Sequence, residues 1–244
     1  MKVSIIIVHY HVKEALFNCL ASIKTSKINF SYEVIVVDND EKKLIKNELY
    51  EKFPHVRYVK TERNKGYATG NNIGAKLAKG EFLLFLNPDT IVGKDAIDTL
   101  VKFIDCDKNI GIVAPLLLDK NKKTYPLQGT AQLTPKTGLF ALTFLNKLFP
   151  NNPISRNYWL LDWDKKNPEK VNVVPGTAFL IRKDVFEKVG GFDERFFLYF
   201  EESDLCLRVR EIGYDVFINP DAKVIHFWGM STKGKTDRDI HFSK

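Results

Sequence analysis

Short apolar runs alternate with segments of helical periodicity along the first half of the chain. Four runs are rich in β-branched and aromatic residues and have the length of buried strands, at residues 3–8, 33–38, 56–60 and 81–87. The intervening segments space their apolar residues like helices, at 13–24, 42–51 and 70–79. Apolar strands separated by helices are typical of a mostly parallel sheet covered on both faces. We therefore expect an α/β fold with its chemistry at the carboxyl ends of the strands.

The pattern changes near the middle of the chain. Residues 119–168 are rich in proline, asparagine and lysine and hold one apolar patch at 137–149, which indicates a loop-rich insertion with one amphipathic segment. Regular structure returns over 171–193, where we predict a strand pair and a short helix that ends at a glycine pair. We expect two halves of a single domain, residues 1–115 and 116–244.

Composition and charge narrow the class of protein. Hydrophobic residues make up 44% of the chain and charged residues 27%, but no apolar run approaches the ~20 residues of a membrane-spanning helix. Three distant cysteines in apolar contexts, and an N-terminus without a signal-peptide cleavage site, favour a reducing, cytoplasmic location. The net charge of +7 indicates an anionic partner, which charge alone does not identify as nucleic acid, phosphorylated small molecule or acidic lipid surface.

Carboxylates follow two of the predicted strands. Asp89, in the sequence Asn-Pro-Asp-Thr, comes after a proline that ends its strand, and at a sheet edge it would suit Mg²⁺ or Mn²⁺ bridging phosphate oxygens. The alternative is that this sequence only caps the next helix. Asp38 has the same position one strand earlier and can accept a hydrogen bond from a base or ribose, with Tyr10 offering a flat face for stacking. Turn chemistry is the alternative for Asp38.

Glycines recur between these two carboxylates. Gly66, Gly70 and Gly74 permit close backbone approach and open a helix whose N-terminal amides can face a phosphate. The spacing of these glycines matches neither the dinucleotide fingerprint nor the P-loop. It supports a phosphate site only because the glycines lie between Asp38 and Asp89 in the sequence.

Three acids begin a predicted helix at residues 202–212. At roughly 100° per residue, its inward stripe holds Leu205, Val209 and Ile212. Glu202 falls within that arc, whereas Glu201 lies further off and Asp204 points away, one turn from Arg208, with which it can pair. Apolar surroundings would raise the pKa of Glu202 and the helix N-terminus would lower it, so its net direction stays open. The alternative is that all three acids simply favour a helix N-terminus.

A final strand delivers His226 beside Trp228. A single histidine is more often a hydrogen-bonded structural residue than a ligand, unless it meets Asp89 across a metal.

Together these segments resemble the inverting nucleotide-sugar glycosyltransferases of family 2, which have the GT-A fold, and especially their rhamnosyltransferase-like branch. The matching segments are SIIIVHYH, VIVVDND, NKGYATGNNIGAK, FLLFLNPDT, PGTAFLIRKDVFEKVGGFDERFFLYFEESDLCLRVREIGY and VIHFWGMST. The resemblance covers most of 1–115 and 171–232, and it implies a three-layer α/β sandwich in which residues 1–115 bind the nucleotide sugar and 116–244 the acceptor.

The resemblance also implies residue roles. A divalent cation, Mg²⁺ or Mn²⁺, would be held by Asp89 and His226, with Asn87 where the family's Asp-x-Asp element has its first acid. Glu202 matches the general base, which is Asp in many relatives. Substrate-binding residues would be Tyr10, Asp38, Gly66, Tyr67, Asn72, Asn87, Gly176, Glu201 and Asp204.

We therefore interpret the chain as an inverting glycosyltransferase that moves rhamnose or a hexose from a dTDP- or UDP-sugar donor. The acceptor would be a polysaccharide or a lipid-linked saccharide in cell-surface glycan synthesis. Basic charge and the 137–149 patch add a hypothesis of peripheral contact with the inner face of a membrane.

Two alternatives remain. A nucleotidyltransferase acting on a sugar phosphate shares the sheet and the metal acid, but would place a Gly- and Lys-rich signature directly after the first strand, where this chain has HYHVKEAL. A non-catalytic nucleic-acid-binding protein would explain the charge, but the lysines are scattered rather than interleaved with aromatics, so we expect no nucleic-acid partner.

Overall fold

The computed structural model describes residues 1–41 and 44–227. Its strands are β1 (Val3–His9), β2 (Tyr32–Asp38), β3 (Arg57–Lys60), β4 (Phe82–Leu86), β5 (Thr90–Val92), β6 (Ile110–Leu118), β7 (Glu169–Lys170), β8 (Ala178–Arg182) and β9 (Asp215–His226). Its helices are α1 (Lys13–Thr25), α2 (Lys46–Lys52), α3 (Gly66–Leu77), α4 (Ala96–Cys106), α5 (Pro135–Leu142), α6 (Leu145–Leu148), α7 (Pro153–Tyr158), α8 (Lys183–Lys188) and α9 (Glu201–Glu211).

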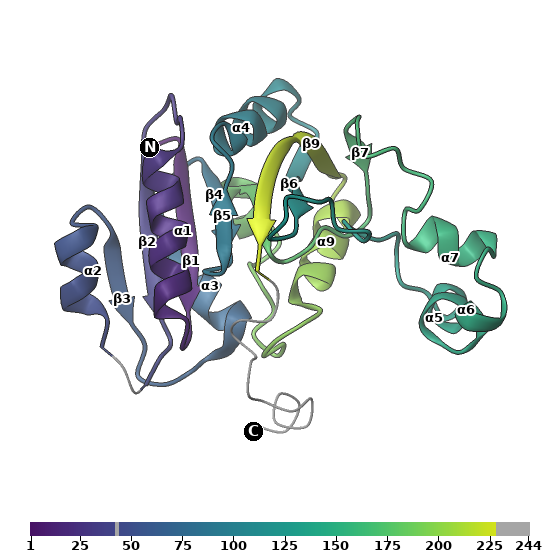
Figure 1. Cartoon of the computed structure of the whole chain (residues 1–244), viewed down its shortest axis with the longest axis horizontal. Coiled ribbons are helices and arrows are strands. Elements are labelled where there is room, and N and C mark those ends of the chain that lie inside the picture. The colour runs from purple at the N-terminus through teal and green to yellow at the C-terminus, as the bar shows by residue number, and fades with distance from the viewer. Residues whose placement is uncertain (42–43, 228–244) are drawn as a thin grey trace.

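One mixed sheet runs through the molecule in the order β3-β2-β1-β4-β8-β6-β9-β5, with β7 pairing β9 (Figure 1). The strands β3, β2, β1 and β4 are parallel, as the apolar runs predict, and β8 enters antiparallel between β4 and β6. Parallel strands present their carboxyl ends at one edge, so the ends of β1, β2 and β4 converge there.

Helices cover both faces of the sheet, which confirms the expected α/β architecture of three layers. One core packs α1 and α4 on the sheet through side chains such as Leu16 and Leu100. The other core packs α3, α8 and α9 on the opposite face through Ala68, Phe186 and Leu205. Burial of these continuous apolar runs is the main source of stability.

The glycines of α3 explain how closely this helix approaches the sheet. A methyl group added at Gly74 would lie 2.4 Å from Cγ2 of Ile6, and one added at Gly70 would lie 2.9 Å from Cγ1 of Val8. Gly70 and Gly74 were expected to let the backbone approach a phosphate. In the structure they let the helix approach β1 instead. The helix also begins at Gly66 rather than at residue 70.

The second half of the chain departs furthest from its pattern. Residues 119–168 hold three short helices, α5 to α7, where one amphipathic segment was expected. Figure 1 shows them standing apart from the sheet. The last strand, β9, is longer than expected. It pairs parallel with β6 both before and after a register shift that follows Asn219. The second half of β9 also pairs antiparallel with β5.

Two further expectations concern the burial of the cysteines and the absence of a membrane-spanning helix. Cys19 and Cys206 are buried as expected, but Cys106, at the end of α4, is exposed. Within the described ranges, no helix is both long enough and apolar enough to cross a bilayer.

Candidate active site

The end of β2 carries a buried polar network. Asp38 is fully buried, and its Oδ1 lies 2.9 Å from Nδ1 of His9. Its Oδ2 accepts hydrogen bonds from the hydroxyl of Tyr58 at 2.6 Å and from Nζ of Lys60 at 3.4 Å. Burial raises the pKa of Asp38, but the hydrogen bonds from His9 and Tyr58 outweigh it and hold the pKa below its ordinary value. This carboxylate is therefore enclosed by its own chain, and a role of Asp38 in holding the base stays a prediction.

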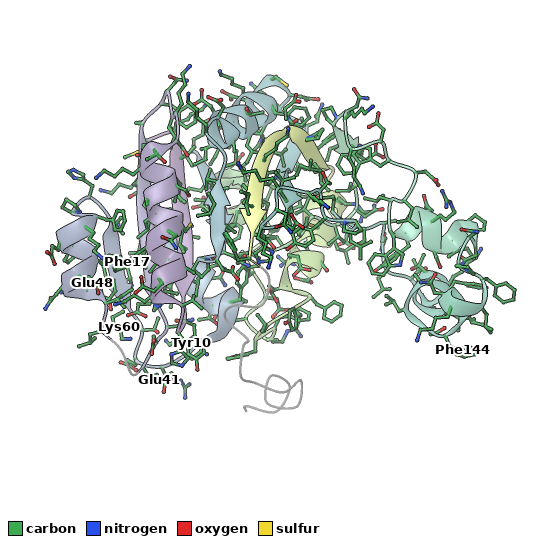
Figure 2. The ribbon with its side chains drawn as sticks, in the orientation of Figure 1. Tyr10, Phe17, Glu41, Glu48, Lys60 and Phe144 are labelled. Carbon is green, nitrogen blue, oxygen red and sulfur yellow. The ribbon has the colours of Figure 1, made fainter. Side chains whose placement is uncertain are left out.

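A second acid two residues later is closer to the surface opening. Oδ2 of Asp40 lies 2.9 Å from Nδ1 of His11, whose ring centroid is 3.9 Å from that of Tyr10. Figure 2 shows Tyr10 at this edge, near Glu41 and Lys60. A cavity of about 420 Å³ opens beside them, lined by His11, Lys13, Asp40, Leu44, Ile45 and Glu48. In the sequence, His11 and Asp40 belong to the matching segments SIIIVHYH and VIVVDND, but no role was predicted for either residue.

The loop before α3 is fixed by contacts within the chain. Gly66 has φ +80°, and a methyl group added to it would lie 2.5 Å from the carbonyl oxygen of Phe197. The amide of Tyr67 donates to the same oxygen at 2.9 Å. Asn72 accepts from the amide of Phe192 at 2.9 Å and donates to Glu194 at 3.0 Å. Because its amide group holds the segment after α8, Asn72 has a structural role that the spacing did not indicate.

Asp89 and His226 meet where β5 pairs with β9. Oδ1 of Asp89 lies 3.4 Å from Nε2 of His226, and both residues are buried. The register that pairs Thr90 with His226 produces this contact. Asn87 stands two residues before Asp89, and its backbone carbonyl accepts from the hydroxyl of Thr90 at 2.7 Å. Trp228, expected beside His226, lies outside the described residues.

The acids of α9 differ in burial. Glu201 is 4% exposed, whereas Glu202 is partly exposed. Two successive residues with left-handed backbone, Tyr199 at φ 71° and Phe200 at φ 69°, turn the chain into the helix at this point. The prediction that Glu201 lies further from the interior than Glu202 was therefore wrong, because burial at the first turn of a helix is set by tertiary contacts and not by the helical face alone. Ile212 was also placed inward and is 37% exposed.

Both carboxyl groups are harder to ionise than in water. Burial, followed by the charge of Glu202, raises the pKa of Glu201 to about 7. Burial also raises the pKa of Glu202, so desolvation outweighs the helix N-terminus. Oε2 of Glu201 is buried without a hydrogen-bond partner among residues 1–41 and 44–227. Raised carboxyl pKa values are typical of acid–base sites.

Gly176 keeps the space beside Glu202 open. A methyl group added at Gly176 would lie 3.6 Å from Oε2 of Glu202, so a side chain at this position would contact the glutamate directly. The hydroxyl of Tyr67 donates to the carbonyl of Gly176 at 2.6 Å and fixes this loop. The next residue, Thr177, accepts from the amide of Asn87 at 2.8 Å. The Gly176–Thr177 loop therefore joins Glu202 to the segment that carries Asp89.

Asp204 pairs with Arg208, as the helix spacing predicts. Oδ2 of Asp204 accepts from Nε of Arg208 at 2.8 Å. Nη1 of the same arginine donates to the carbonyls of Val189 at 2.6 Å and Gly191 at 2.8 Å. The pair thus ties α9 to the end of α8, and a substrate-binding role for Asp204 stays a prediction.

Asp89 and His226 supply an oxygen and a nitrogen side by side. Within the described part of the chain, no group of three His, Cys, Asp or Glu residues gathers as a closed metal site would require. Mg²⁺ and Mn²⁺ take few protein ligands and keep positions for water and phosphate oxygens, so these two residues fit such a cation bound together with a diphosphate.

Comparison with known proteins identifies the family. The sequence profile of Glycosyl transferase family 2 matches residues 4–190, more than half of the chain. The chain belongs to glycosyltransferase family 2. It is 28% identical over 212 residues to the N-acetylglucosaminyl-diphospho-decaprenol L-rhamnosyltransferase of Mycobacterium tuberculosis, covering 82% of this chain and 67% of that protein. It is 30% identical over 219 residues to the low-salt glycan biosynthesis hexosyltransferase Agl10 of Haloferax volcanii, covering 87% of this chain and 63% of that protein.

The fold of this family 2 member matches solved GT-A structures. A crystal structure of GalNAc-T7 with UDP, GalNAc and Mn²⁺ superposes with a TM-score of 0.70 at 20% identity, over 93% of this chain and 44% of that one. The chain thus spans about two thirds of the two curated relatives and less than half of the structural one. The GT-A fold is confirmed, and so is the family resemblance.

Proposed function

We propose that this chain is an inverting glycosyltransferase that uses a nucleotide-diphosphate sugar and transfers rhamnose or a hexose. The observation that carries the proposal is the position of Glu202, which is partly exposed above Gly176 and connected through Thr177 to the segment of Asp89. A base carboxylate and a diphosphate-binding carboxylate at one sheet edge are the minimum that inverting transfer requires.

The proposed reaction is a single in-line displacement. Glu202 takes the proton of an acceptor hydroxyl as that oxygen attacks the anomeric carbon. The bond between this carbon and the diphosphate breaks, and its electron pair leaves with the diphosphate. Asp89 and His226 would hold a divalent cation, which when bound neutralises charge on the departing diphosphate. Burial raises the pKa of Glu201 to about 7 and also raises the pKa of Glu202, so the two acids titrate as an interacting pair, and Glu202 acts as the base in its ionised form.

The nucleotide would lie at the ends of β1 and β2. A cavity of about 420 Å³ beside Tyr10 has a size suited to a base and ribose. Lys60 and Lys13 stand near it as cations. Asp38 would then support the site from beneath, through His9 and Tyr58, rather than bind the base itself.

The sugar and the acceptor are proposed from the relatives. One relative's name describes rhamnosyl transfer to a lipid-linked N-acetylglucosamine, and the other's describes hexosyl transfer in glycan biosynthesis. We infer a dTDP-rhamnose or UDP-hexose donor, and an acceptor that is a polysaccharide or a lipid-linked saccharide. Lipid-linked acceptors place the reaction at the cytoplasmic face of a membrane.

The test combines donor screening with a base variant. Thermal-shift and hydrolysis assays of nucleotide sugars, with and without Mn²⁺, find the donor, and transfer is then measured for Glu202→Gln. We expect kcat to fall by about 10²–10⁴ with donor affinity unchanged. Glu211→Gln, an exposed glutamate at the other end of α9, is the matched control and should keep full activity. If Glu202→Gln keeps full transfer while Glu201→Gln loses it, the base is misassigned.

A further inference from the structure

The helices α5 to α7 and their flanks carry an exposed apolar surface. Of the seventeen large hydrophobic side chains that are exposed among the described residues, eight lie between positions 127 and 161. Phe144, labelled at the far right of Figure 2, is 67% exposed. These eight residues, called here the apolar lobe surface, are Leu127, Leu133, Leu139, Leu142, Phe144, Leu148, Phe149 and Leu161.

This surface belongs to a folded element rather than to a loose loop. Thr134 and Thr137 form a reciprocal capping box at the start of α5, and Asn152 caps α7. The hydroxyl of Ser155 donates to the carbonyl of Phe140 at 2.9 Å and joins α7 to α5. The amide of Ala131 donates to Tyr158 at 2.9 Å where the lobe meets the body. The apolar side chains are therefore held outward by a defined backbone.

The segment that carries this surface, residues 127–161, contains only positive charges. No aspartate or glutamate occurs from residue 127 to 161, whereas Lys136, Lys147 and Arg156 do, which gives this segment a formal charge of +3. Arg156 forms an ion pair with Asp162. Lys136 and Lys147 are exposed and make no ion pair within residues 1–41 and 44–227. The uncompensated charge thus lies among exposed leucine and phenylalanine.

We propose that the apolar lobe surface docks on an anionic phospholipid bilayer. Its leucine and phenylalanine side chains would enter the level of the headgroups, and Lys136 and Lys147 would contact lipid phosphates, as in peripheral proteins that lie in the interface. A second copy of the chain fits less well, because pairing two such surfaces brings their positive charges together. The inference rests on the proposed function only in that a lipid-linked acceptor gives the contact its purpose.

Vesicle co-sedimentation of the full chain tests this docking without donor or acceptor. We expect binding to phosphatidylcholine vesicles that contain phosphatidylglycerol, and weaker binding to phosphatidylcholine alone. The double variant Lys136→Gln, Lys147→Gln should bind about 25-fold more weakly, since each lysine near an anionic surface contributes roughly a factor of five. Lys24→Gln with Lys27→Gln removes the same charge around the C-terminal end of α1 and should change binding little.

The apolar contribution has its own variant. Phe144→Ser with Leu148→Ser and Phe149→Ser should abolish binding and leave the thermal unfolding transition in place, because all three side chains are exposed. The docking is wrong if the wild-type chain stays in the supernatant with anionic vesicles, or if the α1 lysine pair weakens binding as much as the lobe pair. A wild-type dimer in light scattering that this triple variant converts to monomer would also overturn it, in favour of a second copy.

The two proposals fail separately. Donor binding is measured by thermal shift without vesicles, and vesicle binding without donor. A chain that binds a nucleotide sugar but ignores anionic vesicles loses the docking and keeps the proposed function. A chain that binds anionic vesicles but no nucleotide sugar keeps the docking and loses the proposed function.

Discussion

Nε2 of His226 lies 3.4 Å from Oδ1 of Asp89, although the two residues are far apart in the sequence. The antiparallel pairing of β5 with β9 places Thr90 opposite His226 and brings the two side chains together. Loss of either partner should therefore affect the same property of the protein, its affinity for a divalent cation.

Asp89→Asn should weaken the apparent Mn²⁺ affinity in donor hydrolysis by about tenfold or more, and His226→Ala should do so by a comparable factor. The measurement is a Mn²⁺ titration at saturating donor. Asp95→Asn, an exposed acid directly before α4, is the control and should leave the titration unchanged. Equal Mn²⁺ dependence in all four proteins would show that the pair binds no metal.

The pH dependence of transfer should report Glu202. A general base works only when ionised, and burial raises the pKa of Glu202, so kcat should rise with pH through a limb above the ordinary glutamate pKa of 4.5. Glu202→Asp should retain this limb with a lower plateau, whereas the residual rate of Glu202→Gln should lack it. A limb that persists in Glu202→Gln and disappears in Glu201→Gln would assign the base to Glu201.

Glu201→Gln should stabilise the protein at alkaline pH. The pKa of Glu201 is raised from 4.5 to about 7, so the folded state binds more protons than the unfolded state between these values and stability falls as pH rises. Glutamine removes this loss, and the gain in free energy of unfolding should reach roughly 3 kcal/mol at pH 8 and vanish near pH 4. Urea unfolding at the two pH values measures it. Glu211→Gln, on the exposed end of α9, should show no such pH dependence.

Gly74→Ala should destabilise the fold by overpacking. The added methyl group would lie 2.4 Å from Cγ2 of Ile6, and forced adjustments of this kind cost about 1–3 kcal/mol. The cost should shrink in an Ile6→Ala background, which removes the clashing methyl, and denaturant unfolding of the double-mutant cycle measures this coupling. Purely additive effects would mean that α3 has room to shift away from β1.

Much of the first half of the fold follows from its pattern. Strands such as β1 and β4 are continuous apolar runs that only a sheet covered on both faces can bury, so their existence and parallel arrangement are predictable. Because Asp38 ends one of these parallel strands and Asp89 follows another, the sequence also predicts that both lie at the same edge of the sheet. The sequence also predicts the ion pair of Asp204 with Arg208, because side chains four apart are neighbours on the surface of a helix.

The relation of Glu201 to Glu202 was not predictable in this way. Periodicity ranks side chains inside a helix, but at its first turn burial depends on what the preceding segment covers. Here two left-handed residues, Tyr199 and Phe200, precede the helix, Glu201 is buried, and Glu202 lies beside Gly176, which is distant in sequence. Both are consequences of tertiary packing.

The sequence by itself thus determined the alternation of strands and helices and the sheet edge where chemistry gathers, because hydrophobic periodicity is a local property. Only the tertiary structure decided which polar groups are closed and which are open. Asp38 is enclosed by His9 and Tyr58, and five large apolar side chains of 137–149 are exposed, although Ala141 of the same segment is buried. The physical reason is that burial and partners of a polar side chain are set by segments far away in the chain, which no local spacing records.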